Sequence, residues 1–274
     1  MTSGSPRWYT IGFVAPERPL ARSLGSGTLV SFGTLHGILT ARHVVDEMHK
    51  QKEGGRLNEI GLVQSTMRDA QLQGIRFPSD FINDVTIGHE PDDEFGPDLA
   101  FIRLPDQTAA ALMANCSFLN FHNEAELLKS PAPDGTKQRD FIFGIVAEWD
   151  TDEPDPSKGL DMGLISVQMN EGNVNEIAAR DGYDRLEFSP LHDQEFQALP
   201  NQNVFPPKSY GGTSGGGLWR LAVETMADGK ERLVQSRLLG LPYFEKEVNG
   251  WLTIICHGPD SIYRRLPETI RSRW

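Results

Sequence analysis

A serine within a run of glycines is the first residue whose setting points to chemistry. Residues 211–217 read GGTSGGG, with Ser214 in the middle. Glycines on both sides leave the hydroxyl accessible, and Gly212 can adopt a positive φ that turns its N–H group toward a reacting centre. The N–H groups of Gly212 and Ser214 are therefore candidates for an oxyanion hole. A flexible glycine loop would carry the same letters, so the serine needs partners elsewhere in the chain.

A histidine at the end of an apolar strand is the second candidate. A serine hydroxyl is a weak nucleophile until a base that titrates near neutral pH accepts its proton, and histidine is the usual base. The chain has seven histidines, and His43 stands out because it lies in TARHV (40–44), where an apolar strand gives way to a polar turn or helix. His257, which follows Cys256 at a strand end, is interpreted as a packed or hydrogen-bonded residue.

An aspartate completes the set. Asp98 lies in GPDLAFI (96–102), where it opens an apolar strand and can hold its carboxylate half-buried toward an imidazole. Such a partner fixes the tautomer of the base and stabilises the imidazolium ion. Asp98 taken alone would be an ordinary turn residue, and the acidic residues just before it are expected to be solvated. Together, the three candidates predict acyl transfer by a serine nucleophile.

Composition narrows the class of protein. The 274 residues are 38% hydrophobic and 23% charged, which suits a folded domain with a sizeable core. The formal net charge of −12 opposes binding to nucleic acid, whose phosphates attract Lys and Arg. No apolar run approaches the ~18 residues of a membrane helix, and no basic and apolar leader is visible, so we expect a cytoplasmic protein with no membrane partner. Cys116 and Cys256 form neither a disulfide framework nor a zinc motif, and no metal or cofactor is expected.

Short β-rich runs between turns predict an all-β fold. The 27 glycines and 18 prolines suit a fold with many turns, and helices do not alternate with the strands as they would in a βαβ fold. The expected strands are residues 8–14, 27–32, 35–41, 59–63, 99–104, 141–148, 163–169, 185–188, 233–241 and 251–256.

Two further segments organise the chain. Residues 124–140 have a polar centre with Pro and Gly, and we expect them to link two halves. Near the end, apolar residues recur at a spacing of four, which predicts a helix; they are Ile262, Leu266 and Ile270. Asp260 or Ser261 is the expected cap of this helix, and Pro267 argues against a regular one.

In their order along the chain, His43, Asp98 and Ser214 resemble the trypsin-like (chymotrypsin-fold) serine peptidases. TARHV matches the family's Thr-Ala-x-His around the base, and DLAFI matches its aspartate followed by an apolar strand. GTSGGG matches its Gly-x-Ser-Gly-Gly, and GSGTLV at 25–30 is similar to the strand before the histidine. The resemblance spans roughly residues 8 to 260, and three motifs in the right order are specific where each alone is weak.

The resemblance implies an all-β fold of two antiparallel six-stranded β-barrels with a C-terminal helix. His43 and Asp98 would come from the first barrel and Ser214 from the second, with the site in the cleft between them. One peptidase domain would cover residues 1–274, divided into a first barrel (8–123), a linker (124–140), a second barrel (141–258) and a C-terminal helix (259–274).

The resemblance also implies a serine endopeptidase that hydrolyses polypeptide substrates through an acyl-enzyme, without a metal or cofactor. By the same resemblance, residues 207–210 and 239–243 line the primary pocket. Its candidate substrate-binding residues are Lys208, Tyr210 and Leu241. An inward-pointing Lys208 would favour an acidic side chain before the cut, by direct charge pairing. An exposed surface lysine is the alternative interpretation.

The chain departs from the secreted members of the family and is similar to the intracellular bacterial ones. It lacks their disulfides, has Gly217 where Pro is frequent, and has Thr213 where many have Asp. Thr213 carries no charge, so it cannot pair with an amino terminus freed by cleavage, and burying an unpaired ammonium is costly. We therefore expect a site that is competent as made, or one ordered by a partner protein or ligand, and not one switched on by N-terminal cleavage.

Two alternatives to a peptidase remain open. The first is a catalytically silent trypsin-like barrel that acts as a binding or sensor module, although such a module has no need to keep all three residue types. The second is an esterase-like hydrolase with the same triad. The order Ser, Asp, His of α/β-hydrolases is absent, which disfavours that fold.

Overall fold

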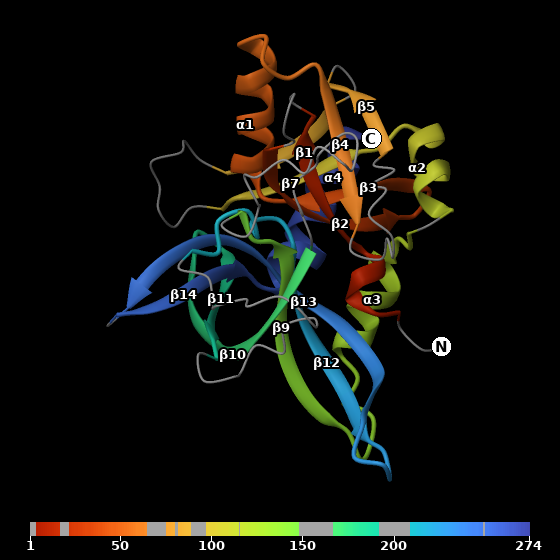
Figure 1. Ribbon diagram of the computed structural model, residues 1–274, viewed down its shortest axis with the longest axis vertical. Helices are drawn as coiled ribbons and strands as arrows, with labels where there is room; N and C mark the ends of the chain where they lie inside the picture. Colours follow the sequence, from red (N-terminus) through yellow and green to blue (C-terminus); the bar gives the residue numbers. More distant parts are fainter. Residues whose placement is uncertain are drawn as a thin grey trace, which may run out of the picture.

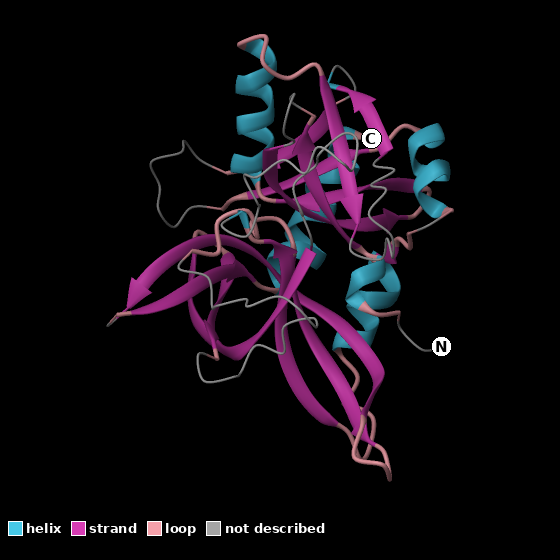
Figure 2. Cartoon of the chain, in the orientation of Figure 1, coloured by secondary structure: helices cyan, strands magenta, loops and turns pink. Residues whose placement is uncertain are grey.

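Strands dominate the described part of the chain, and they form two sheets that lie one above the other in Figure 1. The helices gather around the upper sheet and at the junction between the two (Figure 2). The structure is a computed structural model, and it describes residues 4–16, 22–64, 75–79, 82–88, 97–114, 116–147, 167–191, 209–248 and 250–274.

The first sheet is built from the strands before residue 121. Its order is β5-β4-β1-β2-β3-β7-β6, and the short β8 pairs with β2 in parallel. The strands are β1 (Thr10–Ala15), β2 (Arg22–Phe32), β3 (Leu35–Thr40), β4 (Glu59–Gln64), β5 (Ile75–Pro78), β6 (Asn83–Ile87), β7 (Leu99–Arg103) and β8 (Leu119–Asn120). The helices of this half are a 3-10 turn (Pro6–Trp8), α1 (Arg42–Glu53), α2 (Asp106–Met113) and α3 (Phe121–Leu128).

The second sheet closes on itself as a six-stranded antiparallel barrel in the order β10-β11-β14-β13-β12-β9. Its strands are β9 (Lys137–Ile145), β10 (Val167–Arg180), β11 (Tyr183–Pro190), β12 (Gly217–Thr225), β13 (Glu231–Val248) and β14 (Trp251–His257). The segment 124–140, expected as a linker, holds most of α3 and the first residues of β9.

The expectation of two six-stranded barrels is correct for the second half and wrong for the first. Within the residues that the structure describes, the first sheet is an open half-barrel, and its edge strands β5 and β6 do not pair with each other. A barrel closes only when its outer strands tilt and stagger into register. β5 has four residues and β6 has five. Each edge strand therefore has few backbone groups with which it could pair to close a barrel.

Both sheets contribute to one core. Gly12 on β1 shows how closely they approach, because a Cβ at this position would lie 1.8 Å from Cδ1 of Ile145 on β9. The shared cluster joins residues of the first sheet, the barrel and the C-terminal helix, among them Val14, Leu39, Phe101, Phe143, Ile145, Trp219, Ile262, Leu266 and Ile270. The two halves therefore cannot separate without exposing large apolar side chains to water.

The C-terminal helix is present and irregular. A π-helical turn (Ser261–Arg265) leads into α4 (Leu266–Arg273), with Pro267 in the first turn where a proline is tolerated. The expected apolar stripe is fully buried, and α4 packs against β6 and β7 of the first sheet. The chain therefore returns from the last strand of the barrel to the opposite half of the molecule.

The cap of this helix differs from the expectation. Neither Asp260 nor Ser261 caps it through its own side chain. The carboxylate of Asp184 on β11 accepts the N–H groups of Asp260 (2.9 Å) and Ser261 (2.7 Å) and also the Ser261 hydroxyl (2.5 Å). An acidic side chain from a strand thus takes the role that is normally filled by a residue at the helix start.

Candidate active site

His43 and Asp98 meet because their strands are neighbours. β3 ends at Thr40, α1 begins at Arg42, and β3 pairs with β7 so that Thr40 lies opposite Ala100. The Asp98 carboxylate, just before β7, binds the base twice. Its Oδ2 lies 2.6 Å from Nδ1 of His43, and its Oδ1 accepts the backbone N–H of His43 at 2.9 Å. The ring is thereby held with Nε2 left for another partner, as a general base requires.

His43 and Asp98 shift each other's pKa. Burial lowers the pKa of His43, but the hydrogen bond and charge of Asp98 outweigh burial, and the pKa lies above its ordinary value of 6.5. For Asp98, burial raises the pKa, but the hydrogen bonds and charge of His43 outweigh it and hold the pKa below its usual range. Asp98 is therefore ionised at neutral pH, and the imidazolium form of His43 is stabilised, which favours proton transfer to this ring.

In the turn that carries Ser214, most backbone N–H groups donate hydrogen bonds within the protein. Five N–H groups between residues 210 and 216 are engaged, namely Tyr210 to the Glu245 carboxylate, Gly211 to Ser209 Oγ (3.0 Å), Thr213 to Tyr210 O (3.0 Å), Gly215 to Pro242 O (2.9 Å) and Gly216 to Thr213 O (2.9 Å). Among the described residues, the N–H groups of Gly212 and Ser214 have no such partner. These are the two groups that the sequence marks as an oxyanion hole.

Glycine is required in this turn at two points. Gly212 has φ 91° and Gly215 has φ 83°, values that side-chain-bearing residues rarely adopt. A Cβ on Gly215 would also lie 2.1 Å from the Thr40 hydroxyl oxygen and 2.9 Å from the backbone N of Ala41. The turn therefore packs directly on the segment that leads into His43. The hydrogen bonds of the described residues join His43 to Asp98, and none of them joins His43 to Ser214.

Ser26 on β2 ties the serine turn to the first sheet, and sequence reasoning noticed only its strand. Its N–H donates to the Ser214 carbonyl at 3.0 Å, and its hydroxyl donates to the Gly212 carbonyl at 2.7 Å. The same hydroxyl accepts the N–H of Ile145 on β9, and the Ser26 carbonyl accepts the Thr40 hydroxyl, both at 2.7 Å. Ser26 is fully buried. No pattern in the sequence marks a serine inside a strand as such a junction.

His257, at the end of β14, reaches the acid of the other half. It is buried and hydrogen-bonded, as expected, and its Nε2 accepts the backbone N–H of Asp98 at 2.9 Å. Its ring stacks on Tyr243 with centroids 4.2 Å apart. Burial lowers the pKa of His257 to about 4, so the ring is neutral at ordinary pH and Nε2 keeps the lone pair that the bond needs. Cys256 before it could have suggested a packed strand end, but nothing in the sequence named Asp98 as the partner.

A cavity of about 100 Å³ opens beside Ser214. Its described lining is Ser209, Tyr210, Gly211, Thr213, Ser214, Pro242, Tyr243, Phe244, Glu245 and Ile254. Of the candidate substrate-binding residues, Tyr210 lies in this wall, and Leu241 is instead fully buried in the shared core. Lys208 lies outside the described residues. The cavity has room for one side chain and is smaller than the usual site for a small-molecule ligand.

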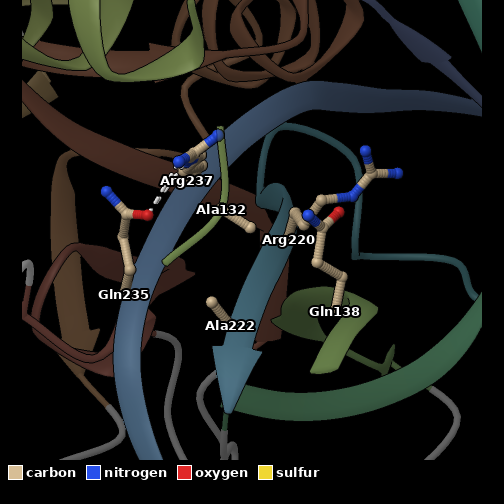
Figure 3. A pocket seen from close by; sticks show the side chains of 6 residues that line it. All are labelled: Ala132, Gln138, Arg220, Ala222, Gln235 and Arg237. Atoms are coloured by element: carbon tan, nitrogen blue, oxygen red, sulfur yellow. Dashed lines mark hydrogen bonds between the residues drawn. The ribbon is translucent and has the colours of Figure 1, made fainter. Parts of the chain in front are cut away.

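Two other cavities lie away from these residues. A larger one of about 710 Å³ lies between α3, the barrel and the C-terminal segment. The cations at its edge already have partners, since Arg220 binds Asp140, Arg264 binds Asp260 and Lys129 binds Glu126. The other measures about 10 Å³, room for about one water. Figure 3 shows it next to Arg237, which is turned toward Gln235.

Comparison with known proteins adds little to this site. No protein-family model matches the sequence, and no curated protein matches it. A solved structure from a study of the coupled folding and binding of the intrinsically disordered Sesbania mosaic virus VPg protein is similar over 97% of this chain and 93% of that one, at 14% identity and a TM-score of 0.44. Values this low carry no argument about function. Within the described ranges, no helix is long and apolar enough to cross a membrane.

What is established for this chain is a β-rich fold, compatible with the chymotrypsin-like double barrel, in which one barrel is closed and the other is an open half-barrel.

Proposed function

We propose that the chain is a serine endopeptidase of the trypsin-like kind, which cuts polypeptides with Ser214 as nucleophile, His43 as general base and Asp98 as the group that orients the base. The observation that carries this proposal is the hydrogen-bond pattern of the serine turn. Five N–H groups of the turn are engaged within the described residues, and those of Gly212 and Ser214 are left for a ligand. Paired N–H donors beside a serine are what a developing oxyanion needs.

In the proposed reaction each of these groups has one role. His43 Nε2 takes the proton of Ser214 Oγ as that oxygen attacks the peptide carbonyl carbon, and the oxyanion accepts the two N–H groups. Asp98 stabilises the imidazolium ion. His43 then gives the proton to the leaving amine, and the acyl-enzyme forms. Water attacks the ester by the same route, which releases the carboxylic acid and restores the serine hydroxyl. The steps require no metal or cofactor.

Labelling with a fluorophosphonate tests the proposal, because this probe reacts with a serine only when base and oxyanion donors activate it. The full-length protein should be labelled at Ser214, and labelling should disappear in Ser214→Ala and in His43→Ala. Ser272→Ala and His122→Ala change exposed residues of the same types and should label as the unchanged protein does. A folded protein that is not labelled at Ser214, either alone or with substrate-like peptide added, would contradict the proposal.

A catalytically silent barrel that acts as a binding or sensor module is the second candidate. The observation that favours it is that no described hydrogen bond links His43 to Ser214, although catalytic hydrogen bonds are often long in proteins without substrate. This candidate predicts no labelling under any condition. A peptidase that is ordered by a partner protein or ligand predicts labelling that appears when substrate-like peptide is added.

Activation by N-terminal cleavage finds no support at Thr213. The side chain is buried, and its hydroxyl donates to the Tyr210 carbonyl at 2.7 Å. The position is therefore satisfied by its own turn and has no carboxylate for a terminal ammonium. Protein with an added N-terminal extension should be labelled at the same rate as the full-length chain. Labelling that begins only after a cut exposes a free amine would show that cleavage is the switch.

A further inference from the structure

Tyr243 on β13 lies at a β-bulge next to the serine turn. The pairing of β13 with β14 shifts register between Pro242 and Phe244, which leaves Tyr243 without a partner in the ladder. The Pro242 carbonyl accepts the N–H of Gly215 in the serine turn at 2.9 Å. A bulge changes the direction of a side chain and is frequent beside active sites. The contacts of the Tyr243 ring therefore indicate what the bulge achieves.

The ring of Tyr243 stacks on the imidazole of His257. The ring centroids lie 4.2 Å apart with an angle of 15° between the planes, and the two residues are 6% and 1% exposed. Tyr183 contacts the same imidazole edge-on at 6.3 Å. Close packing of buried rings opposes rotation of the imidazole. Because Nε2 of His257 accepts the Asp98 N–H, and a hydrogen bond weakens steeply when it is bent, the stack helps to keep this bond.

Tyr243 also packs into the half of the molecule that carries the base. It belongs to a buried cluster in which only Tyr243 and Ile255 come from the barrel, and the other buried members come from the first sheet and its helices. Ala41 and Val44, which lie just before and just after His43 in the sequence, are in this cluster. One side chain of the barrel is thus held by the packing around His43 while it stacks on the residue that binds Asp98.

We infer that Tyr243 is a positioning residue for Asp98 and acts through His257. The stack holds the His257 ring, the ring holds the Asp98 backbone, and the Asp98 carboxylate holds Nδ1 of His43. The inference rests on the proposed peptidase function and adds a residue to its site. Tyr243 has no part in bond making, but a small misplacement of a catalytic group lowers the rate strongly.

Phe244 provides a matched control, because Tyr243 also has a simpler possible role as a wall of the cavity beside Ser214. Tyr243 and Phe244 both line that cavity, and Phe244 packs against the same core cluster. In the part of the chain that the structure describes, the ring contacts of His257 are with Tyr183 and Tyr243 and not with Phe244. A residue that only forms the cavity wall affects substrate binding and KM, whereas a positioning residue affects kcat.

Steady-state hydrolysis of a peptide substrate by the full-length protein separates the two roles. Tyr243→Leu should lower kcat by about ten-fold or more, because the His257 ring loses its stack. Tyr243→Phe keeps the stacked ring and should retain kcat within about two-fold. Phe244→Leu should also retain kcat within about two-fold, whatever its effect on KM. Equal losses of kcat in Tyr243→Leu and Phe244→Leu would overturn the inference, and so would an effect of Tyr243→Leu that is confined to KM.

Urea unfolding checks that each variant is folded before its kinetics are measured. Tyr243→Met is the second ring-free variant, because its flexible side chain fills irregular space in a core. It carries the same expectations as Tyr243→Leu and replaces that variant if Tyr243→Leu does not fold. A ring-free variant that is folded and keeps the kcat of the unchanged protein would show that the stack does not position the acid.

An NMR titration of the His43 ring tests the positioning without any turnover. Burial lowers the pKa of His43, and the hydrogen bond and charge of Asp98 outweigh burial and raise it, with a smaller contribution from Asp46 that the variants leave in place. A looser hold on Asp98 should therefore move the midpoint of the His43 titration to lower pH in Tyr243→Leu, but not in Tyr243→Phe or Phe244→Leu.

The titration distinguishes failure of the inference from failure of the proposed function. A midpoint that falls only in the ring-free variants supports the positioning role even if the protein hydrolyses no peptide. A midpoint that stays unchanged in Tyr243→Leu overturns the positioning role even if the protein is an active peptidase.

Discussion

The open sheet and the closed barrel contribute different parts of the candidate site and hold them in different ways. The sheet brings His43 and Asp98 together through two adjacent strands, and their contacts lie within one half of the molecule. The barrel presents Ser214 on a turn whose backbone bonds to itself and to β13. One buried residue of each half also forms hydrogen bonds with the other half. Ser26 on β2 bonds to the serine turn, and His257 on β14 bonds to Asp98.

This exchange shows where the alignment of the site is decided. The His43 side chain is 48% exposed, so its packing alone does not fix its position, whereas Ser26 and His257 are 0% and 1% exposed. Ser26 and His257 therefore make buried hydrogen bonds between the two halves next to the site, and we expect them to help align the more exposed base. A residue can matter to the reaction through this alignment without touching a substrate.

The largest effect should come from removing either half's share of the chemistry. Ser214→Ala and His43→Ala should each lower kcat by roughly 10⁴–10⁶-fold, and the double variant should be little worse, because the residues act as a unit. Asp98→Asn should be severely impaired through the wrong tautomer of His43, and Asp106→Asn at the start of α2 should not. Steady-state hydrolysis of a peptide substrate measures this. If the losses of kcat in the two single variants added up in the double variant, Ser214 and His43 would not act as a unit.

Glu124, which bonds across the contact between the two halves, should make the free energy of unfolding depend on pH. Glu124 on α3 is buried and accepts the Leu238 N–H of β13 at 2.8 Å, and burial raises its pKa to about 7. The folded state binds this proton more tightly than the unfolded state, so the free energy of unfolding should fall by about 3 kcal/mol as pH rises from 4.5 through 7. Glu124→Gln should remove this fall in urea unfolding at pH 5 and 8. Glu126→Gln, exposed on the same helix, should keep it.

The barrel's hold on the acid should be separable from simple packing. His257→Phe keeps a ring beside Tyr243 but leaves the Asp98 N–H without its acceptor, and kcat should fall by about 10–100-fold through misplacement of the acid. His257→Gln supplies an acceptor oxygen and should recover part of kcat. KM should change little in both variants. A loss of thermal stability with unchanged kcat would make His257 a packing residue only.

The sheet's hold on the serine turn should have a smaller effect. Ser26→Ala removes the hydroxyl that joins Gly212 and Ile145, while the Ser26 N–H still binds the Ser214 carbonyl. We expect kcat to fall by about ten-fold and stability by about 1–3 kcal/mol, because the buried Ile145 N–H loses its partner. Ser236→Ala removes a buried hydroxyl that bonds to Gly4 away from the site. Ser236→Ala should lower stability without lowering kcat. If both variants lowered kcat equally, the bond of Ser26 to the serine turn would have no special role in the reaction.

The smallest effect concerns the pH at which the base works. His43 must be neutral to accept a proton, and Asp98 raises its pKa above 6.5. The rate kcat/KM should therefore rise with pH along a limb whose midpoint lies above 6.5. Asp98→Asn removes the charge that stabilises the imidazolium ion, so the midpoint of its residual activity should move to lower pH. If the midpoint were the same in both proteins, Asp98 would not raise the pKa of His43.

Part of the fold followed from local patterns. The strands around His43, Asp98 and residues 251–256 were expected because short apolar runs between turns have few other uses. The C-terminal stripe of Ile262, Leu266 and Ile270 was expected because its period matches one helix face. β5 and β6 were missed because IRFP and NDVTI are short and not strongly apolar. Their strand structure comes from pairing with β4 and β7.

The sequence by itself determined which residue types were present for chemistry and in what order, since a glycine-flanked serine and a strand-end histidine can be recognised locally. Only the tertiary structure decided that one barrel closes and the other stays open, and that Asp184 caps the last helix. It also decided that His257 holds Asp98 across 159 residues. Such partners depend on register and packing between distant segments, and a shift of one residue in either strand would turn these side chains to the opposite face.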